Sequence, residues 1–111
     1  MDITCEHHGG TLVARVDEDR IDAACAIQFK DRMREVVTDP AKRVILDLSQ
    51  VLFLDSSGLG AVVAVMKLVG PDRSLELAGL TPTVEKVFRL TRMDRVFTIH
   101  TNLPAPLHHA G

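Results

Sequence analysis

At 111 residues the chain has the length of one domain, and 46% hydrophobic with 25% charged residues is typical of a globular protein. Thirteen basic and fifteen acidic residues give a formal net charge of −2, so no basic surplus indicates a nucleic-acid partner. The chain has no Trp or Tyr and four Phe. This composition also argues against aromatic platforms for stacking bases.

The N-terminal stretch MDITCEHHGG is acidic and differs from a signal peptide. The longest apolar run, Leu59 to Val69, is far shorter than the ~20 residues that span a bilayer. We therefore expect a cytoplasmic protein without membrane insertion. Cys5 and Cys25 are expected to be small buried residues rather than a disulfide pair. The spacing of Cys and His does not indicate a metal site, and we expect no cofactor.

In the first third of the chain, Leu12 to Val16 reads as a strand, and Ile3 belongs to a partner strand across the His8-Gly9-Gly10 turn. The polar stretch VDEDRID follows as a connection, and its last residue, Asp22, is the expected N-cap of a helix from Ala23 to Val37. The apolar stripe of that helix has helical spacing. It consists of Ala26, Ile27, Phe29, Met33, Val36 and Val37.

Val44 to Leu48 has few polar residues, which predicts a strand buried on both faces. A helix from about Ser57 to Val69 follows, and Gly70-Pro71-Asp72 stops it. Its expected inward stripe is Leu59, Val62, Val63, Met66 and Val69. Because this helix is apolar nearly all round, its outer face is covered either by a neighbouring helix or by a partner protein.

Leu75 and Leu77 mark another strand, and Thr81-Pro82 opens a third helix with Pro at its first position. The inner face of that helix is expected at Val84, Val87, Phe88 and Thr91, and RVFTI at 95–99 is a last strand. This order predicts an α/β fold, a small mixed sheet of four to five strands with three or more helices mainly on one side. We expect one domain over 1–100 and a flexible tail over 101–111.

The stretch Asp55-Ser56-Ser57-Gly58-Leu59-Gly60 separates the central strand from the second helix. Asp55 or Ser56 can cap that helix, whereas the two glycines weaken it and predict the close approach of another backbone. A phosphate on Ser56 or Ser57 would add about −1.5 to −2 charge where a helix tolerates an anion and a packed partner does not. Two interpretations follow, a structural cap and a phosphorylation switch.

The stretch VILDLSQVLFLDSSGLGAVVAVMKLV resembles the central segment of STAS domains, in particular that of bacterial anti-sigma factor antagonists. The later stretch LAGLTPTVEKVFRLTRMDRVFTI is similar to the third helix and final strand of the same family. The resemblance implies the STAS fold and a non-enzymatic role in transcription regulation. It also implies that Ser56 is phosphorylated, and that partner contacts come from Asp22, Asp55, Ser57, Gly58 and Leu59.

The implied partners are an anti-sigma factor that is also a serine kinase of the ATPase fold, and a phosphatase that removes the phosphate. The unphosphorylated form would bind the anti-sigma factor and the phosphorylated form would release it, the protein itself being a monomer or weak dimer. The chain departs from the family pattern at Asp17, where glycine is common. It departs again at Thr91-Arg92-Met93, where Thr-Gly-Leu is common.

Two alternatives remain at this point. A STAS subunit of an ABC-type lipid transport complex would use the same fold as a structural partner. A hydrolase with Ser56 or Ser57 as nucleophile would need one of the five histidines as its base, and the chain has no Gly-x-Ser-x-Gly elbow.

Overall fold

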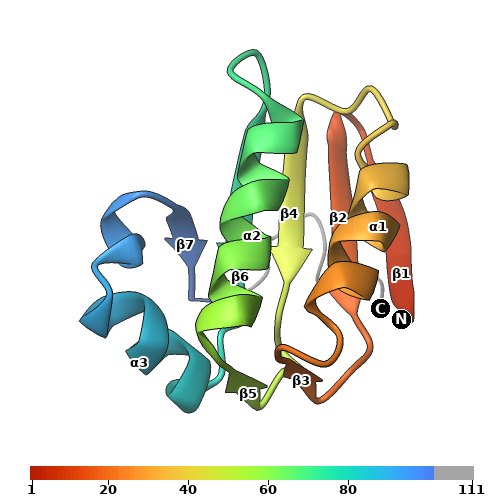
Figure 1. Ribbon diagram of the computed structural model, residues 1–111. Helices are drawn as coiled ribbons and strands as arrows, with labels where there is room; N and C mark the ends of the chain where they lie inside the picture. The colour runs from red at the N-terminus through yellow and green to blue at the C-terminus, as the bar shows by residue number, and fades with distance from the viewer. Residues whose placement is uncertain (102–111) are drawn as a thin grey trace, which may run out of the picture.

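The computed structural model describes residues 1–101, and its centre is a five-stranded sheet in the order β1-β2-β4-β6-β7 (Figure 1). The strands of this sheet are β1 Ile3–His8, β2 Thr11–Val16, β4 Arg43–Asp47, β6 Ser74–Ala78 and β7 Thr98–His100. β1 is antiparallel to β2, across the predicted glycine turn, and each other neighbouring pair is parallel. The predicted mixed α/β sheet is therefore confirmed. The part of the chain expected as a tail lies outside the described residues from 102 onward.

The helices among residues 1–101 are α1 Ala26–Val36, α2 Ser56–Val69, α3 Pro82–Leu90 and the 3-10 turn η1 Met93–Arg95. α1 and α2 lie side by side over one face of the sheet (Figure 1). Their inward side chains meet alternate residues of the strands, because successive side chains of a strand point to opposite faces. Phe29 and Met33 of α1, Val62 and Val65 of α2 and Leu46 of β4 are all fully buried in this core.

A second, two-stranded sheet pairs β3 Arg20–Ile21 with β5 Phe53–Leu54 in parallel. Each strand is too short to carry an alternating pattern, and one of them lies inside the stretch expected as a plain polar connection. This small sheet lies at the end of the molecule where α1 and α2 begin (Figure 1). It therefore joins the segments that precede the two helices.

The predicted helix boundaries need correction at α1. The helix begins at Ala26 rather than Ala23, and its N-cap is Cys25 rather than Asp22. Asp22 instead closes the preceding turn, since its main-chain carbonyl accepts from the N–H groups of Cys25 and Ala26 at 3.1 and 2.8 Å. Ile27, expected on the inner stripe, is 68% exposed because it lies on the side of α1 turned away from the buried stripe of Ala26, Phe29, Met33 and Val36.

The predicted inner face of α2 is also wrong in part. The buried residues of this helix are Gly58, Ala61, Val62, Val65 and Val69. Leu59, Val63 and Met66 are only partly buried against the core. The helix is apolar on several sides because α1 lies against it, so a neighbouring helix covers much of the face that could have awaited a partner.

Three further details differ from the sequence-based expectation. Thr91 is exposed and donates its hydroxyl to the carbonyl of Val87, at 2.7 Å, instead of facing the core. The last strand begins at Thr98, after η1, rather than at residue 95. Cys5 is exposed and Cys25 half-buried, so neither is the fully buried residue expected, and both are free thiols.

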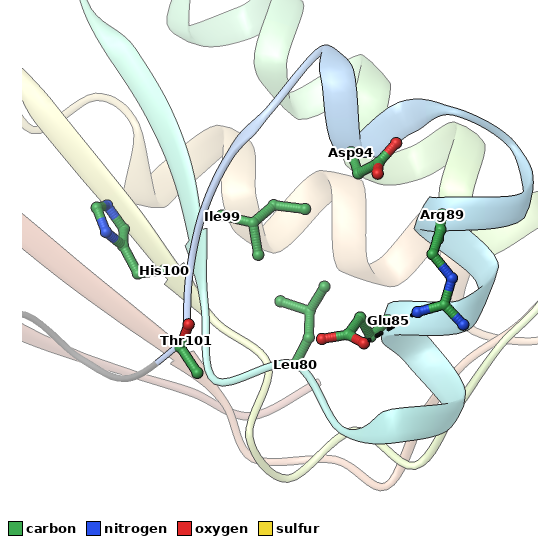
Figure 2. A pocket seen from close by; sticks show the side chains of 7 residues that line it. All are labelled: Leu80, Glu85, Arg89, Asp94, Ile99, His100 and Thr101. Carbon is green, nitrogen blue, oxygen red and sulfur yellow. Dashed lines mark hydrogen bonds and ion pairs between the residues drawn. The ribbon is translucent and has the colours of Figure 1, made fainter.

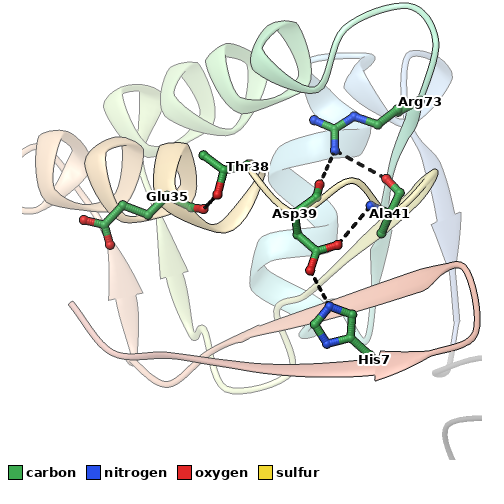
Figure 3. A network of polar contacts seen from close by, with 6 residues as sticks. All are labelled: His7, Glu35, Thr38, Asp39, Ala41 and Arg73. Atoms are coloured by element: carbon green, nitrogen blue, oxygen red, sulfur yellow. Dashed lines mark hydrogen bonds and ion pairs between the residues drawn. The ribbon is translucent and has the colours of Figure 1, made fainter.

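The carboxyl ends of α1 and α2 are tied together by Arg73, which lies between α2 and β6. Its guanidinium donates to the carbonyls of Val37 and Asp39 at 2.9 and 2.6 Å, and to those of Ala41 and Val69 at 3.3 Å each. Figure 3 shows Arg73 over the α1–β4 connection, with His7 of β1 reaching the Asp39 carboxylate from the other side. Carbonyls that a helix end leaves without an intrahelical donor are thus satisfied by one side chain.

No helix among residues 1–101 combines the length and the apolar character needed to cross a membrane.

Candidate functional site

The candidate site begins at the N-terminus of α2, where Asp55 is the N-cap. Its backbone is extended, with φ −98° and ψ −175°, and its Oδ1 accepts from the N–H of Gly58 at 2.8 Å. Ser56 and Ser57 occupy the first turn and are both exposed. The sequence allowed either Asp55 or Ser56 as the N-cap of α2, and in the structure the N-cap is Asp55. The hydroxyl of Ser56 therefore does not cap the helix.

Gly58 brings α2 against the small sheet. A Cβ added to Gly58 would lie 2.0 Å from the carbonyl oxygen of Ile21, a distance no side chain can occupy. The predicted close approach of another backbone is therefore confirmed at Gly58. At Gly60 it is wrong, because a Cβ there would meet nothing within 4 Å.

The segment before the site is held by main-chain bonds to the β2–β3 connection. The N–H groups of Leu52 and Phe53 both donate to the carbonyl of Asp19, at 2.7 and 3.2 Å. The β3–β5 pairing continues this contact toward Ile21 and Leu54. The β2–β3 connection and the segment before α2 are therefore held together by main-chain hydrogen bonds.

Asp22 belongs to this same corner of the molecule. Its Oδ1 accepts from the N–H of Ala24 at 3.1 Å, and the thiol of Cys25 donates to the same oxygen at 3.4 Å. The next residue, Ala23, donates its N–H to Oδ2 of Asp55 at 3.0 Å. Asp22 and Ser56, distant in sequence, are thus each one residue from a direct bond between the two loops.

The carboxylate of Asp55 is held in its ionised form. The N–H of Gly58 is the largest cause that lowers its pKa below the usual value, and the N–H groups of Ala23 and Ser57 lower it further. Hydrogen bonds from backbone donors stabilise the charged form of a carboxyl group. At neutral pH this corner therefore carries a fixed negative charge beside Ser56.

The sequence reasoning did not single out Leu52 and Phe53 as surface residues. Leu52 is 62% and Phe53 46% exposed, directly before the site, whereas Val51 and Leu54 on either side are buried. The sequence does contain a sign of this exposure, namely four consecutive apolar residues between Gln50 and Asp55. Because successive side chains of an extended segment point to opposite sides, the four cannot all face the core. Large apolar side chains left in solvent beside a candidate site favour a protein-binding surface.

The described histidines do not form a base for the serines. His7 contacts the carboxylate of Asp39, His8 lies 3.5 Å from that of Glu6, and His100 lies 2.7 Å from that of Glu76. Within residues 1–101 no three Cys, His, Asp or Glu side chains gather as a metal site would require.

A cavity of about 370 Å³ lies away from this corner, beside α3 and β7 (Figure 2). Its lining mixes apolar and charged residues, namely Leu80, Glu85, Arg89, Asp94, Ile99, His100 and Thr101. Figure 2 shows Glu85 and Arg89 paired along one side, at 3.2 Å. None of the residues of the Asp-Ser-Ser-Gly segment lines this cavity.

The comparisons with known proteins agree with this arrangement. The STAS domain family matches residues 2–105, so the chain belongs to the STAS domain family. It is 24% identical over 104 residues to an anti-sigma F factor antagonist of Paenibacillus polymyxa, covering 92% of this chain and 88% of that protein. It is 26% identical over 101 residues to the anti-sigma-F factor antagonist RsfB of Mycobacterium tuberculosis, covering 91% of this chain and 82% of that one.

Among solved structures, an anti-sigma factor antagonist from Mycobacterium paratuberculosis superimposes with a TM-score of 0.84 at 27% identity. That superposition covers 96% of this chain and 90% of the other. The STAS fold predicted from the Asp-Ser-Ser-Gly segment and its flanks is therefore confirmed.

Proposed function

We propose that this protein is an anti-sigma factor antagonist that works as a phosphorylation-controlled binding switch, with Ser56 as the phosphate acceptor. The observation that carries the proposal is the position of Ser56. It is exposed in the first turn of α2, while the neighbouring Asp55 supplies the cap. A hydroxyl that the fold does not use and solvent can reach is suited to modification.

In the proposed switch, the unmodified protein binds an anti-sigma factor of the ATPase-fold serine kinase type, and that kinase transfers phosphate to Ser56. The proposed contact surface consists of Asp22, Asp55, Ser57 and Leu59, whereas Gly58, expected on it from the sequence, is buried against Ile21 and sets the position of α2. Exposed Leu52 and Phe53 extend this surface, since large apolar side chains are the usual anchors of protein interfaces. The protein itself carries out no reaction, and a separate phosphatase restores the binding form.

The phosphate would act mainly on binding rather than on folding. A helix N-terminus stabilises a nearby anion, typically by ~0.3–1 kcal/mol, so the domain stays folded with the phosphate attached. A partner packed on the same spot must desolvate the dianion beside the charged Asp55. A cost of ~2.8 kcal/mol already weakens binding about 100-fold.

The proposal is tested with Ser56→Ala and Ser56→Glu used as baits in lysate of the source cell, with Thr38→Ala and Thr38→Glu, at the exposed carboxyl end of α1, as the matched control pair. We expect Ser56→Ala to retain an ATPase-fold kinase that Ser56→Glu loses, while both Thr38 variants retain it. Mass spectrometry of the retained proteins gives the answer. Retention of the same proteins by both Ser56 baits would contradict the proposal, and a transporter ATPase among them would favour the transport-subunit alternative.

A further inference from the structure

The Asp55 side chain bonds to two segments that lie far apart in sequence. Its Oδ1 accepts from the N–H of Gly58 in its own helix, and its Oδ2 accepts from the N–H of Ala23, 32 positions earlier. An N-cap needs only one acceptor oxygen. The second oxygen of Asp55 is therefore not required for α2, and it holds the turn that carries Asp22.

Apart from the bond to Asp55, the turn from Asp22 to Cys25 makes few contacts with the rest of the molecule. Ala23 and Ala24 are exposed, and their methyl groups reach no core. The side chains of Asp22 and Cys25 bond to each other, and the Cys25 thiol also donates to the carbonyl of Arg20 in β3, directly before the turn. A short exposed turn of this kind is expected to be mobile unless a bond from outside fixes it.

We propose that Asp55 is a positioning residue that locks the Asp22–Cys25 turn to the N-terminus of α2, so that Asp22 and Ser56 form one preformed surface. This inference deepens the proposed function and rests on it for its effect on binding. Each oxygen of Asp55 accepts one backbone hydrogen bond, so the carboxylate fixes the position of the turn in addition to lying on the proposed contact surface.

A surface in which Asp22 and Ser56 are already correctly placed should bind its partner with a higher association rate. If the turn is loose, only a fraction of the molecules presents the competent surface at any moment, and the apparent affinity falls by that fraction. The loss then appears in the association rate, whereas the loss of a direct contact appears mainly in the dissociation rate. The two roles of Asp55 can therefore be separated by kinetics.

The bridge itself is tested first, by NMR of the purified protein. As the pH is lowered, we expect the amide protons of Ala23 and Gly58 to shift together with one midpoint, since both report the same carboxylate. In an Asp22→Asn control the Ala23 shift should persist, because the carboxylate that causes it belongs to Asp55. An Ala23 amide that does not shift with pH, or whose shift is lost in Asp22→Asn, would overturn the inference.

The Asp55→Asn variant then tests the positioning role. Asn is nearly isosteric and remains a good N-cap, but its NH2 group cannot accept from the second N–H. We expect hydrogen exchange at Ala23 to become about tenfold faster while exchange at Gly58 changes much less. Equal acceleration at both amides would indicate a general loss of stability and would overturn the positioning role.

Binding is measured with the ATPase-fold protein that the Ser56→Ala bait retains. We expect Asp55→Asn to weaken binding about tenfold through slower association, and Asp19→Asn, which removes the same charge from an exposed neighbour, to change it less than twofold. A loss confined to dissociation, or unchanged binding, would overturn the inference. If the wild-type protein retains no such partner, the proposed function fails, while the amide titration still decides whether the bridge exists.

Discussion

Gly58 and Gly60 look alike in sequence but have opposite surroundings. A side chain at Gly58 would collide with the Ile21 carbonyl, and one at Gly60 would stand in open space. The sequence could predict that a glycine here permits close approach, but not which of the two does so. That depends on where β3 lies, and β3 is too short to leave a pattern.

This difference gives a matched pair of substitutions. We expect Gly58→Ala to destabilise the protein by about 1–3 kcal/mol or more, because the α2 backbone must move away from Ile21. Gly60→Ala should stabilise it by up to ~1 kcal/mol, the difference in helix propensity. Urea unfolding of both variants measures these changes. Equal destabilisation by the two substitutions would show that the packing of α2 on β3 is not as described.

Arg92 is the one non-glycine residue with positive φ, at 62°, among the described residues. It follows the C-cap Thr91 of α3, where many helices place a left-handed glycine. Arg92 stands where glycine is common in the family pattern, and it adopts the left-handed conformation that glycine favours.

We expect Arg92→Gly to stabilise the fold by about 0.5–1 kcal/mol, since the strain of the left-handed conformation exceeds the added flexibility of glycine. Thermal unfolding of wild type and variant measures the effect. Arg95→Gly, in η1 and with φ outside the left-handed region, is the control and should destabilise. A lower melting temperature for Arg92→Gly would contradict this account of the turn.

At the scale of the elements, the long periodic segments were predictable and their ends were not. The inner residues Ala26, Phe29, Met33 and Val36 of α1 follow directly from helical spacing. The start of α1 was misplaced because Asp22 is a strong capping residue whose oxygen is used within a preceding turn. In α2 the apolar residues surround the helix, so spacing alone could not tell the side facing the sheet from the side facing α1.

Arg73 is an element-scale feature that no periodicity reveals. Its four carbonyl partners lie at the end of α1, in the α1–β4 connection and at the end of α2. We expect Arg73→Ala to destabilise the protein by about 2–3 kcal/mol, a range typical of hydrogen bonds to a charged group. Urea unfolding measures the change.

Arg73→Lys is the informative companion variant. A lysine keeps the charge, but its compact ammonium cannot span four carbonyls as a planar guanidinium does. It should therefore recover only a small part of the stability. If Arg73→Lys were as stable as the wild type, the positive charge at the helix ends, and not the planar geometry of the guanidinium, would be what Arg73 contributes.

For the whole molecule, the sheet face opposite α1 and α2 carries a buried carboxylate, Glu76. It accepts from Arg43 at 2.9 and 2.8 Å, from Ser74 at 2.9 Å, and lies 2.7 Å from Nε2 of His100. The Arg43 hydrogen bond is the largest cause that lowers the pKa of Glu76 to about 2, and the bonds from His100 and Ser74 contribute as well. Three neighbouring strands, β4, β6 and β7, are therefore joined by one side chain.

Because the folded-state pKa of Glu76 is depressed, its contribution to stability is complete above the ordinary carboxyl pKa and is lost as the pH falls toward about 2. We expect the free energy of unfolding to fall by up to about 3 kcal/mol over that interval on account of Glu76. Glu76→Gln should be less stable at neutral pH and show a flatter pH dependence. Urea unfolding across this range is the measurement, with Glu85→Gln on exposed α3 as control. An unchanged slope in Glu76→Gln would contradict the assignment.

A small mixed sheet with helices mainly on one side could be predicted from the alternation of strand and helix patterns, and the candidate site from the Asp-Ser-Ser-Gly segment, but the order of the strands in the sheet was not predicted. What the sequence could not supply is the contact between loops far apart in the chain. The bond from Ala23 to Asp55 involves a backbone N–H that any residue but proline would provide, so no side-chain pattern marks it.

The central claim is that a phosphate on Ser56 controls partner binding, and the most direct test measures one partner with two forms of the same protein. The unmodified protein and the form phosphorylated at Ser56, verified by mass spectrometry, are each titrated calorimetrically with the purified anti-sigma factor. The account predicts that phosphorylation weakens binding by about 100-fold or more while the melting temperature changes little. Equal affinity of the two forms, or a phosphate that the kinase places on another residue, would contradict it.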